Sequence, residues 1–180
     1  MSKYVLGLDF GTLSCRGLLV DAQAGQVIAQ EIVAFEHGVI DEELPSYGKL
    51  PPNFALQVPG DCIKSMRGVI DKILYTTGID KTMIGGVGID FTACTWMSID
   101  ENGTPLCELP EFIGNPHAYV KLWKHHAAQP EADQINELAY QRNEPWIPMY
   151  GGKISCEWAL PKTLETLHHA PDVFEKRHAL

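Results

Sequence analysis

The chain has 180 residues, enough to bury the core of one domain, and its 45% hydrophobic and 21% charged residues are ordinary for a globular protein. The formal net charge of -9 argues against a nucleic-acid-binding surface or an anionic membrane as a partner. Five scattered cysteines without a C-x-x-C pair, no signal-peptide pattern and no apolar run of membrane-spanning length favour a cytoplasmic protein with reduced thiols.

The first predicted element is a β-hairpin, with strands at residues 4–9 and 14–21 and a further strand at 27–35. Its first strand ends at Asp9, and Gly11 and Thr12 form the turn. A carboxylate is a hard ligand of the kind that Mg²⁺ accepts, and backbone amides in a glycine turn can bind phosphate. The alternative is an ordinary hairpin in which Asp and Gly only make the turn.

The remaining pattern predicts alternating strands and helices. A Pro-rich loop at 37–59 precedes a helix at 61–77 that ends at Gly78. After it we expect a buried strand at 84–90, a strand at 95–99, a hairpin turn at 100–103, and helices at 115–128, 131–141 and 155–169, the last kinked by Pro161. This order predicts an α/β fold, a mixed sheet flanked by helices.

Two of these strands end in a carboxylate just before a turn, at Asp9 and at Asp90. Ligands collect at strand ends in such sheets. Loop acids at strand ends are also simply solvated, so Asp90 alone indicates little.

Five segments resemble the FGGY carbohydrate kinases, and four of them resemble the ribulokinases within that family. The opening LGLDFGTLSCRGLLVDA resembles the first phosphate motif of the family. The other segments are HGVIDEELP (37–45), VGIDFTACT (87–95), NPHAYVKLWKHHAAQPEAD (115–133) and YGGKISCEW (150–158). The resemblance implies a ribonuclease H-like, actin-like ATPase fold, with residues 1–180 as an incomplete first domain of a two-domain kinase.

The resemblance also implies an activity. Such kinases phosphorylate L-ribulose with ATP and Mg²⁺, giving L-ribulose 5-phosphate in arabinose catabolism. The family's catalytic base and adenosine site lie in segments that this sequence does not match, so we expect little or no kinase activity from the chain alone. The alternatives are a non-catalytic sugar- or nucleotide-binding remnant and a kinase of another pentulose. The expected partner is a small sugar, and exposed sheet surface would favour a homo-oligomer.

Roles for the hairpin follow from the resemblance. Asp9 matches the aspartate that helps to hold Mg²⁺ near the transferred phosphate, which makes it the catalytic and metal-binding candidate. Phosphoryl transfer depends mainly on positioning and charge stabilisation, so a carboxylate suits this role. The candidate ATP-phosphate ligands are Gly11, Thr12, Ser14 and Arg16.

The sugar-site candidates also follow from the resemblance, and they are Thr92, Ala93, Cys94, Trp123, His125 and Lys153. The small side chain of Ala93 would leave room for a sugar. Trp123 is alternatively a core residue of an amphipathic helix, and His125 a surface residue. Lys153 is alternatively an exposed loop lysine, and for Lys121 a solvated face is equally open.

Overall fold

The computed structural model describes residues 3–45 and 47–180, which belong to two compact units. Unit 1 is formed by Met1–Gly38 and Val58–Thr92, and unit 2 by Val39–Gln57 and Ala93–Leu180. None of the helices in the described part of the chain is long and apolar enough to cross a membrane.

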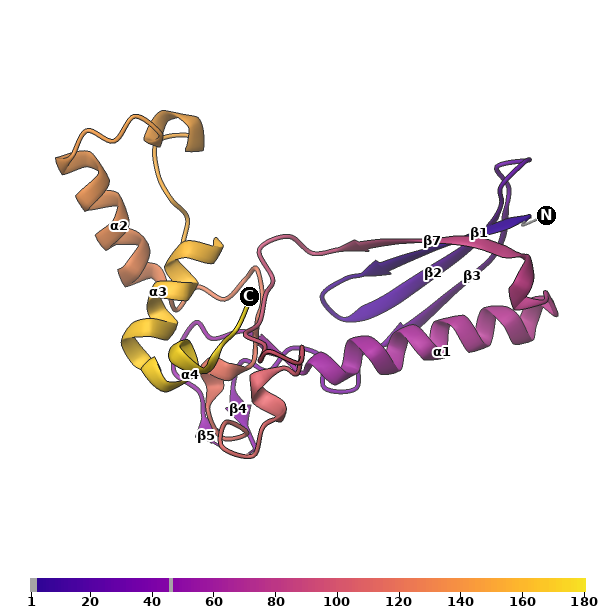
Figure 1. Ribbon diagram of the computed structural model, residues 1–180, viewed down its shortest axis with the longest axis horizontal. Coiled ribbons are helices and arrows are strands. Elements are labelled where there is room, and N and C mark those ends of the chain that lie inside the picture. The colour runs from indigo at the N-terminus through magenta and orange to yellow at the C-terminus, as the bar shows by residue number, and fades with distance from the viewer. Residues whose placement is uncertain (1–2, 46) are drawn as a thin grey trace. The chain divides into compact units, whose positions relative to one another are not determined.

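Unit 1 is built on a four-stranded mixed sheet with the strand order β3-β2-β1-β7 (Figure 1). Its strands are β1 (Tyr4–Phe10), β2 (Ser14–Asp21), β3 (Val27–Ala34) and β7 (Ile84–Phe91). β2 is antiparallel to β1 and β3, whereas β7 is parallel to β1. The predicted hairpin and third strand are therefore confirmed, with boundaries that differ by a residue or two.

Helix α1 (Pro59–Thr77) lies along one face of this sheet (Figure 1). Proline in its first turn lacks an amide hydrogen that the helix would leave unpaired, and Gly78 ends it in the left-handed conformation at φ 64°. The core consists of alternate residues of the strands and one face of the helix: Leu6, Leu8, Cys15, Leu19, Phe35, Val69 and Ile73. This packing needs Gly17, because a Cβ there would lie 2.3 Å from Cγ1 of Val69.

The prediction that strand 84–90 is buried is wrong. Val87, Ile89 and Phe91 are 57%, 62% and 68% exposed. Their register partners on β1 face α1, but the helix packs mainly on β2 and β3, so it does not extend over β7. An apolar strand was thus predicted correctly, and its burial was not.

Unit 2 contains short strands and helices. The strands are β4 (Glu43–Leu44), β5 (Gly48–Lys49), β6 (Leu56–Gln57) and β8 (Val120–Lys121), of which β4 pairs with β5 and β6 with β8. The α-helices are α2 (Gln129–Gln141), α3 (Ala159–His169) and α4 (Pro171–Lys176). Short 3-10 helices lie at Leu106–Glu108, Pro116–Ala118 and Ile147–Tyr150, and a further one, Lys81–Met83, precedes β7 in unit 1.

Three predicted elements of unit 2 are corrected. Residues 95–99 form only isolated bridges, at Trp96 and Ile99. The helix predicted at 115–128 is a single turn, capped by the Asn115 side chain, after which the chain extends to pair with β6. Helix α3 begins at Ala159 rather than at residue 155, so Pro161 lies in its first turn, where proline needs no kink.

Candidate functional site

In unit 1, Asp9 lies between two charged register partners. It pairs with Arg16 on β2 and with Asp90 on β7. Nη1 of Arg16 is 3.3 Å from Oδ2 of Asp9, and both side chains are about half exposed. Side chains alternate along a strand, and the neighbours of Asp9 and Arg16 pack toward α1, so this charged group lies on the sheet face away from the helix.

A cavity of about 650 Å³ surrounds this group. Gly7 and Gly88 are register partners in its lining, and their missing side chains keep the backbone accessible beside the two carboxylates. Two carboxylates and one guanidinium can together bind a divalent cation and phosphate oxygens. The predicted residue Asp9 thus lines a cavity together with Asp90, a carboxylate to which the sequence alone assigned no role.

The turn after Asp9 is closed by backbone hydrogen bonds. The Gly11 amide donates to the Ser14 carbonyl at 3.0 Å, and the Phe35 amide donates to the Leu13 carbonyl at 2.9 Å. Gly11 is not among the residues with positive φ, and its amide is used to close the turn. Thr12 and Ser14 are half-buried beside it, and Leu13 is exposed.

The loop predicted to contact the sugar follows β7. The Thr92 amide donates to the Phe10 carbonyl of β1 at 3.3 Å, within unit 1. Ala93 is exposed, and Cys94 adopts a left-handed conformation with φ 58°. The Trp123 amide donates to Oγ1 of Thr95 at 3.1 Å, so the structure brings this loop and Trp123 together in unit 2.

Trp123 and His125 have different environments. Trp123 is 40% exposed and belongs to no helix, so the interpretation as a helix core residue is wrong. His125 is fully buried, so the surface alternative for it is also wrong, and a sugar could reach its ring only if the packing opened. Nδ1 of His125 accepts a hydrogen bond from the Ala55 amide at 3.2 Å, which assigns the ring proton to Nε2, 3.0 Å from Glu165.

Lys153 lies on an exposed turn. Gly151 and Gly152 precede it with φ of 71° and 96°, conformations that favour glycine. The turn is fastened to α2, because Asn136 exchanges two hydrogen bonds with the Ile154 backbone, at 2.7 and 2.9 Å. Its position is that of the exposed loop lysine that the sequence left as an alternative.

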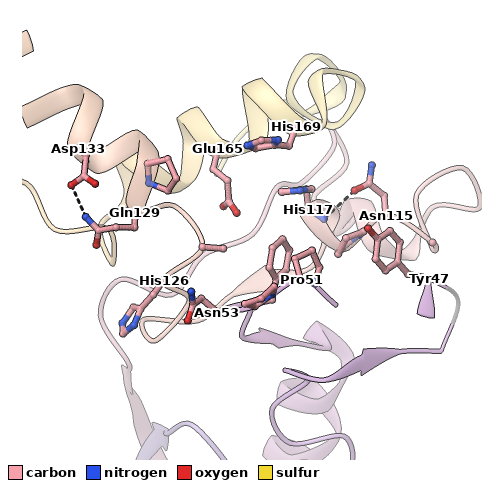
Figure 2. A pocket seen from close by; sticks show the side chains of 16 residues that line it. Tyr47, Pro51, Asn53, Asn115, His117, His126, Gln129, Asp133, Glu165 and His169 are labelled. Carbon is pink, nitrogen blue, oxygen red and sulfur yellow. Dashed lines mark hydrogen bonds between the residues drawn. The ribbon is translucent and has the colours of Figure 1, made fainter. Parts of the chain in front are cut away.

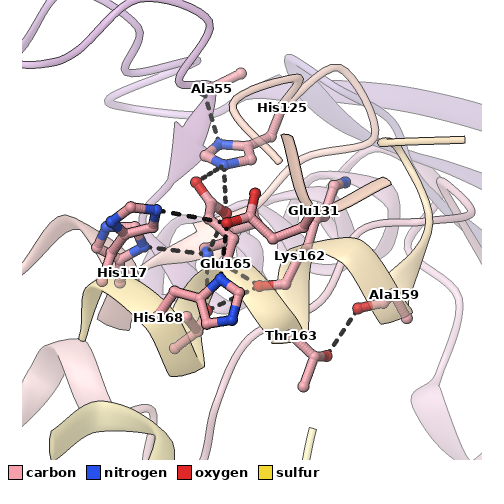
Figure 3. Close-up of polar contacts among 12 residues, drawn as sticks. Ala55, His117, His125, Glu131, Ala159, Lys162, Thr163, Glu165 and His168 are labelled. Atoms are coloured by element: carbon pink, nitrogen blue, oxygen red, sulfur yellow. Dashed lines mark hydrogen bonds and ion pairs between the residues drawn. The ribbon is translucent and has the colours of Figure 1, made fainter. Parts of the chain in front are cut away.

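The structure contains a buried ionic network that the sequence reading missed (Figure 3). The solvated-face alternative for Lys121 is wrong, because the residue is fully buried, and its Nζ lies 2.6 Å from Glu165 and 2.7 Å from Thr166. Burial alone would raise the pKa of Glu165, but the hydrogen bond from His125 and the charge of Lys121 lower it to about 2. Burial lowers the pKa of His125, which keeps the ring neutral. The sequence held one signal of this burial, which is a single lysine within the otherwise apolar run from Ala118 to Leu122.

A second cavity, of about 830 Å³, lies in unit 2 beside this network (Figure 2). Glu165 and His169 approach it from α3, and Asn53 and Pro51 from the segment before β6. Its lining combines amide and imidazole side chains with proline rings and the ring of Tyr47. None of the sequence-predicted site residues lines it.

One trio of metal-ligating side chains lies close together among the described residues: Glu36, His37 and Asp61. Asp61 accepts from the His37 amide at 2.8 Å and lies 2.9 Å from Nδ1 of that ring. Glu36 is paired with Lys64 at 2.8 Å. The trio is therefore explained by contacts at the first turn of α1, and a metal is not needed to hold it together.

Curated proteins similar to this chain are ribulokinases. It is 49% identical over 175 residues to the enzyme of Geobacillus thermodenitrificans and 48% identical over 174 residues to that of Mycolicibacterium smegmatis. These alignments cover 97% and 96% of the chain but 31% of each relative, so the chain spans about a third of their length. No family model matches the sequence.

Solved structures of sugar kinases share the fold. A xyloylose kinase from Brucella ovis matches with a TM-score of 0.74 at 18% identity, covering 97% of this chain and 31% of that one. The xylulose kinase of Rhodospirillum rubrum matches with a TM-score of 0.71, with the same identity and coverage. The predicted fold class, a mixed α/β sheet of the sugar-kinase type representing part of a first domain, is thereby confirmed.

Proposed function

Because the chain belongs to the ribulokinases of the FGGY carbohydrate kinase family and corresponds to their amino-terminal part, we propose that it forms the sugar-binding and phosphate-binding part of a kinase that transfers phosphate from ATP to L-ribulose. In this proposal the product is L-ribulose 5-phosphate, the setting is cytoplasmic arabinose catabolism, and both units belong to one incomplete first domain.

The charged group around Asp9 carries the proposal. Like charges directly opposite each other on neighbouring strands are unfavourable, so Asp9 and Asp90 gain from a bound cation. These carboxylates would hold Mg²⁺, which would neutralise charge on the phosphate during transfer. Arg16 would bind a phosphate oxygen, together with hydroxyls of Thr12 and Ser14 near Gly11.

The sugar would contact the loop after β7. Ala93 is exposed and small, and Trp123 presents an accessible ring near the same loop. Thr92, Cys94, His125 and Lys153 complete the proposed sugar set. Of these, His125 would act from the interior, through the packing of its segment rather than through direct contact.

Isothermal titration calorimetry of the chain with L-ribulose, D-xylulose and glycerol tests the sugar assignment. We expect L-ribulose to bind most tightly, and binding of glycerol alone would contradict the assignment. Ala93→Leu should block binding, because it fills the small position in the loop. Asp133→Leu in the second cavity should leave binding unchanged, and the opposite pattern would move the sugar to that cavity.

A second candidate function is that of a sugar-binding protein without catalysis, the alternative that the sequence left open. A coupled assay of ADP release with L-ribulose distinguishes the two. We expect the chain alone to bind sugar but turn over little ATP, because none of its residues matches the family's base. Turnover at the rate of a complete ribulokinase would contradict this expectation.

A further inference from the structure

The loop at residues 93–96 has a backbone conformation that needs support. Cys94 has φ 58°, and a side chain with a Cβ is disfavoured in this left-handed region. Strained positions of this kind persist only where surrounding contacts hold them. The contacts around this loop therefore decide whether its shape is fixed before a ligand arrives.

Lys162 supplies such a contact from the first turn of α3. Its side chain is fully buried, and its Nζ donates to the Cys94 carbonyl at 2.8 Å and also to the Leu122 carbonyl. Burying an ammonium group is costly unless it is well hydrogen-bonded. Burial lowers the pKa of Lys162 to about 8, a measure of that cost.

The two carbonyls that share this ammonium belong to segments far apart in sequence. Other bonds join the same segments: the Trp123 amide donates to Thr95, and the backbones of Trp96 and Lys121 exchange hydrogen bonds of 3.2 and 2.9 Å. Lys162 thus connects the loop that contains Ala93 to the segment that contains Trp123. Both of these residues have accessible surface.

We propose that Lys162 is a positioning residue, which holds the 93–96 loop against the 122–123 segment and so presets the surface that receives the sugar. The identity of the ligand rests on the proposed function, whereas the clamp is a property of the fold. Lys162 has no accessible surface and does not touch the sugar itself. Its removal should loosen the loop without removing any ligand-contacting group.

The test compares Lys162→Met with Lys176→Met, which removes the same charge from an exposed position on α4. Hydrogen–deuterium exchange of the Trp96 amide reports on the loop, and calorimetry with L-ribulose reports on binding. In Lys162→Met we expect exchange about tenfold faster and binding about tenfold weaker, as for the loss of a charged hydrogen bond. Lys176→Met should match the wild type in both.

If Lys162 had only a structural role, Lys162→Met would lower the urea midpoint of unfolding. Methionine removes the buried charge together with its desolvation cost, so the urea midpoint by tryptophan fluorescence should change little. Lys162→Gln retains an amide donor and should be intermediate in exchange and affinity, and it replaces Lys162→Met if that variant does not fold. Adding Cys94→Gly to either variant should recover part of the affinity, since glycine accepts positive φ, whereas Cys94→Ala should not.

A failure of the sugar assignment and a failure of the positioning role give different results. If the wild-type chain binds no L-ribulose, the sugar assignment fails, while the exchange data still test the clamp. If Trp96 exchange in Lys162→Met stays within about twofold of the wild type, or sugar affinity is unchanged, the positioning role is overturned.

Discussion

Asp9 and Asp90 are direct register partners on the parallel strands β1 and β7, and of the two only Asp9 forms an ion pair among the described residues, with Arg16. Like charges directly opposite each other on neighbouring strands destabilise a sheet. Asp90→Asn should therefore slightly stabilise unit 1 in the absence of metal and weaken divalent-cation binding. Calorimetric titration with Mn²⁺, a probe for Mg²⁺, measures the second effect. Asp71→Asn on α1 is the control, and equal affinity in Asp90→Asn and wild type would contradict the metal role.

Gly17 lets α1 approach the sheet closely. In Gly17→Ala the new Cβ would lie 2.3 Å from Val69 and 3.1 Å from Ile73, so we expect unit 1 to lose about 1–3 kcal/mol of unfolding free energy. Gly86→Ala is the matched control, because a Cβ there meets nothing within 4 Å. Hydrogen exchange of α1 amides under increasing urea gives both values, and equal protection in the two variants would refute the close-approach argument.

The local part of the fold was predictable from the sequence. Strands 4–9 and 14–21 were identified because alternation and a glycine turn are properties of adjacent residues, and α1 because its apolar period, proline start and glycine end lie within one segment. The candidate Asp9 was recognised through a motif of the same local kind. Its partner Asp90 was not assigned, because the register that opposes the two carboxylates joins strands about eighty residues apart in the chain.

Features that depend on distant partners were not predictable. A solvated face stayed open for Lys121 because its acceptor, Glu165, is 44 residues away and the predicted helix itself was wrong. The pairing of β6 with β8 overrides the helical pattern of residues 115–128, since extended backbone there satisfies hydrogen bonds that a helix would have made internally. Similarly, the apolar residues of β7 indicate a strand but not what covers it.

Glu165 neutralises a buried lysine, so its replacement should be costly. Glu165→Gln removes the carboxylate 2.6 Å from Nζ of Lys121 and leaves that ammonium without its counter-charge. Breaking one partner of a buried pair typically costs about 3–5 kcal/mol. All four tryptophans lie in unit 2, so fluorescence during urea unfolding reports on this unit.

The control for this prediction is the exposed pair of Asp41 and Lys124, which lie 3.7 Å apart in the same unit. Asp41→Asn should cost about 1 kcal/mol or less, because water screens exposed charges. A loss in Glu165→Gln no larger than that in Asp41→Asn would show that the network contributes little.

Two histidines, half-buried His117 and fully buried His125, predict how the stability of unit 2 depends on pH. Burial, reinforced by the charge of Lys121, lowers the pKa of His117 from 6.5 to about 4, so the folded state binds a proton less readily than the unfolded state. The contribution of His117 to the stability is complete above pH 6.5 and is lost as the pH falls toward 4. The contribution of Glu165 begins to be lost only below the ordinary pKa of a glutamate, 4.5. Between about pH 7.5 and about pH 5 we expect His117 to account for a loss of about 1–2 kcal/mol in the free energy of unfolding.

Urea unfolding followed by tryptophan fluorescence at the two pH values measures this loss. His117→Gln should reduce the difference in stability between the two pH values, leaving the part due to His125. Exposed His178→Gln should keep the wild-type difference, and an equal pH dependence in His117→Gln and wild type would show that His117 is not the group responsible.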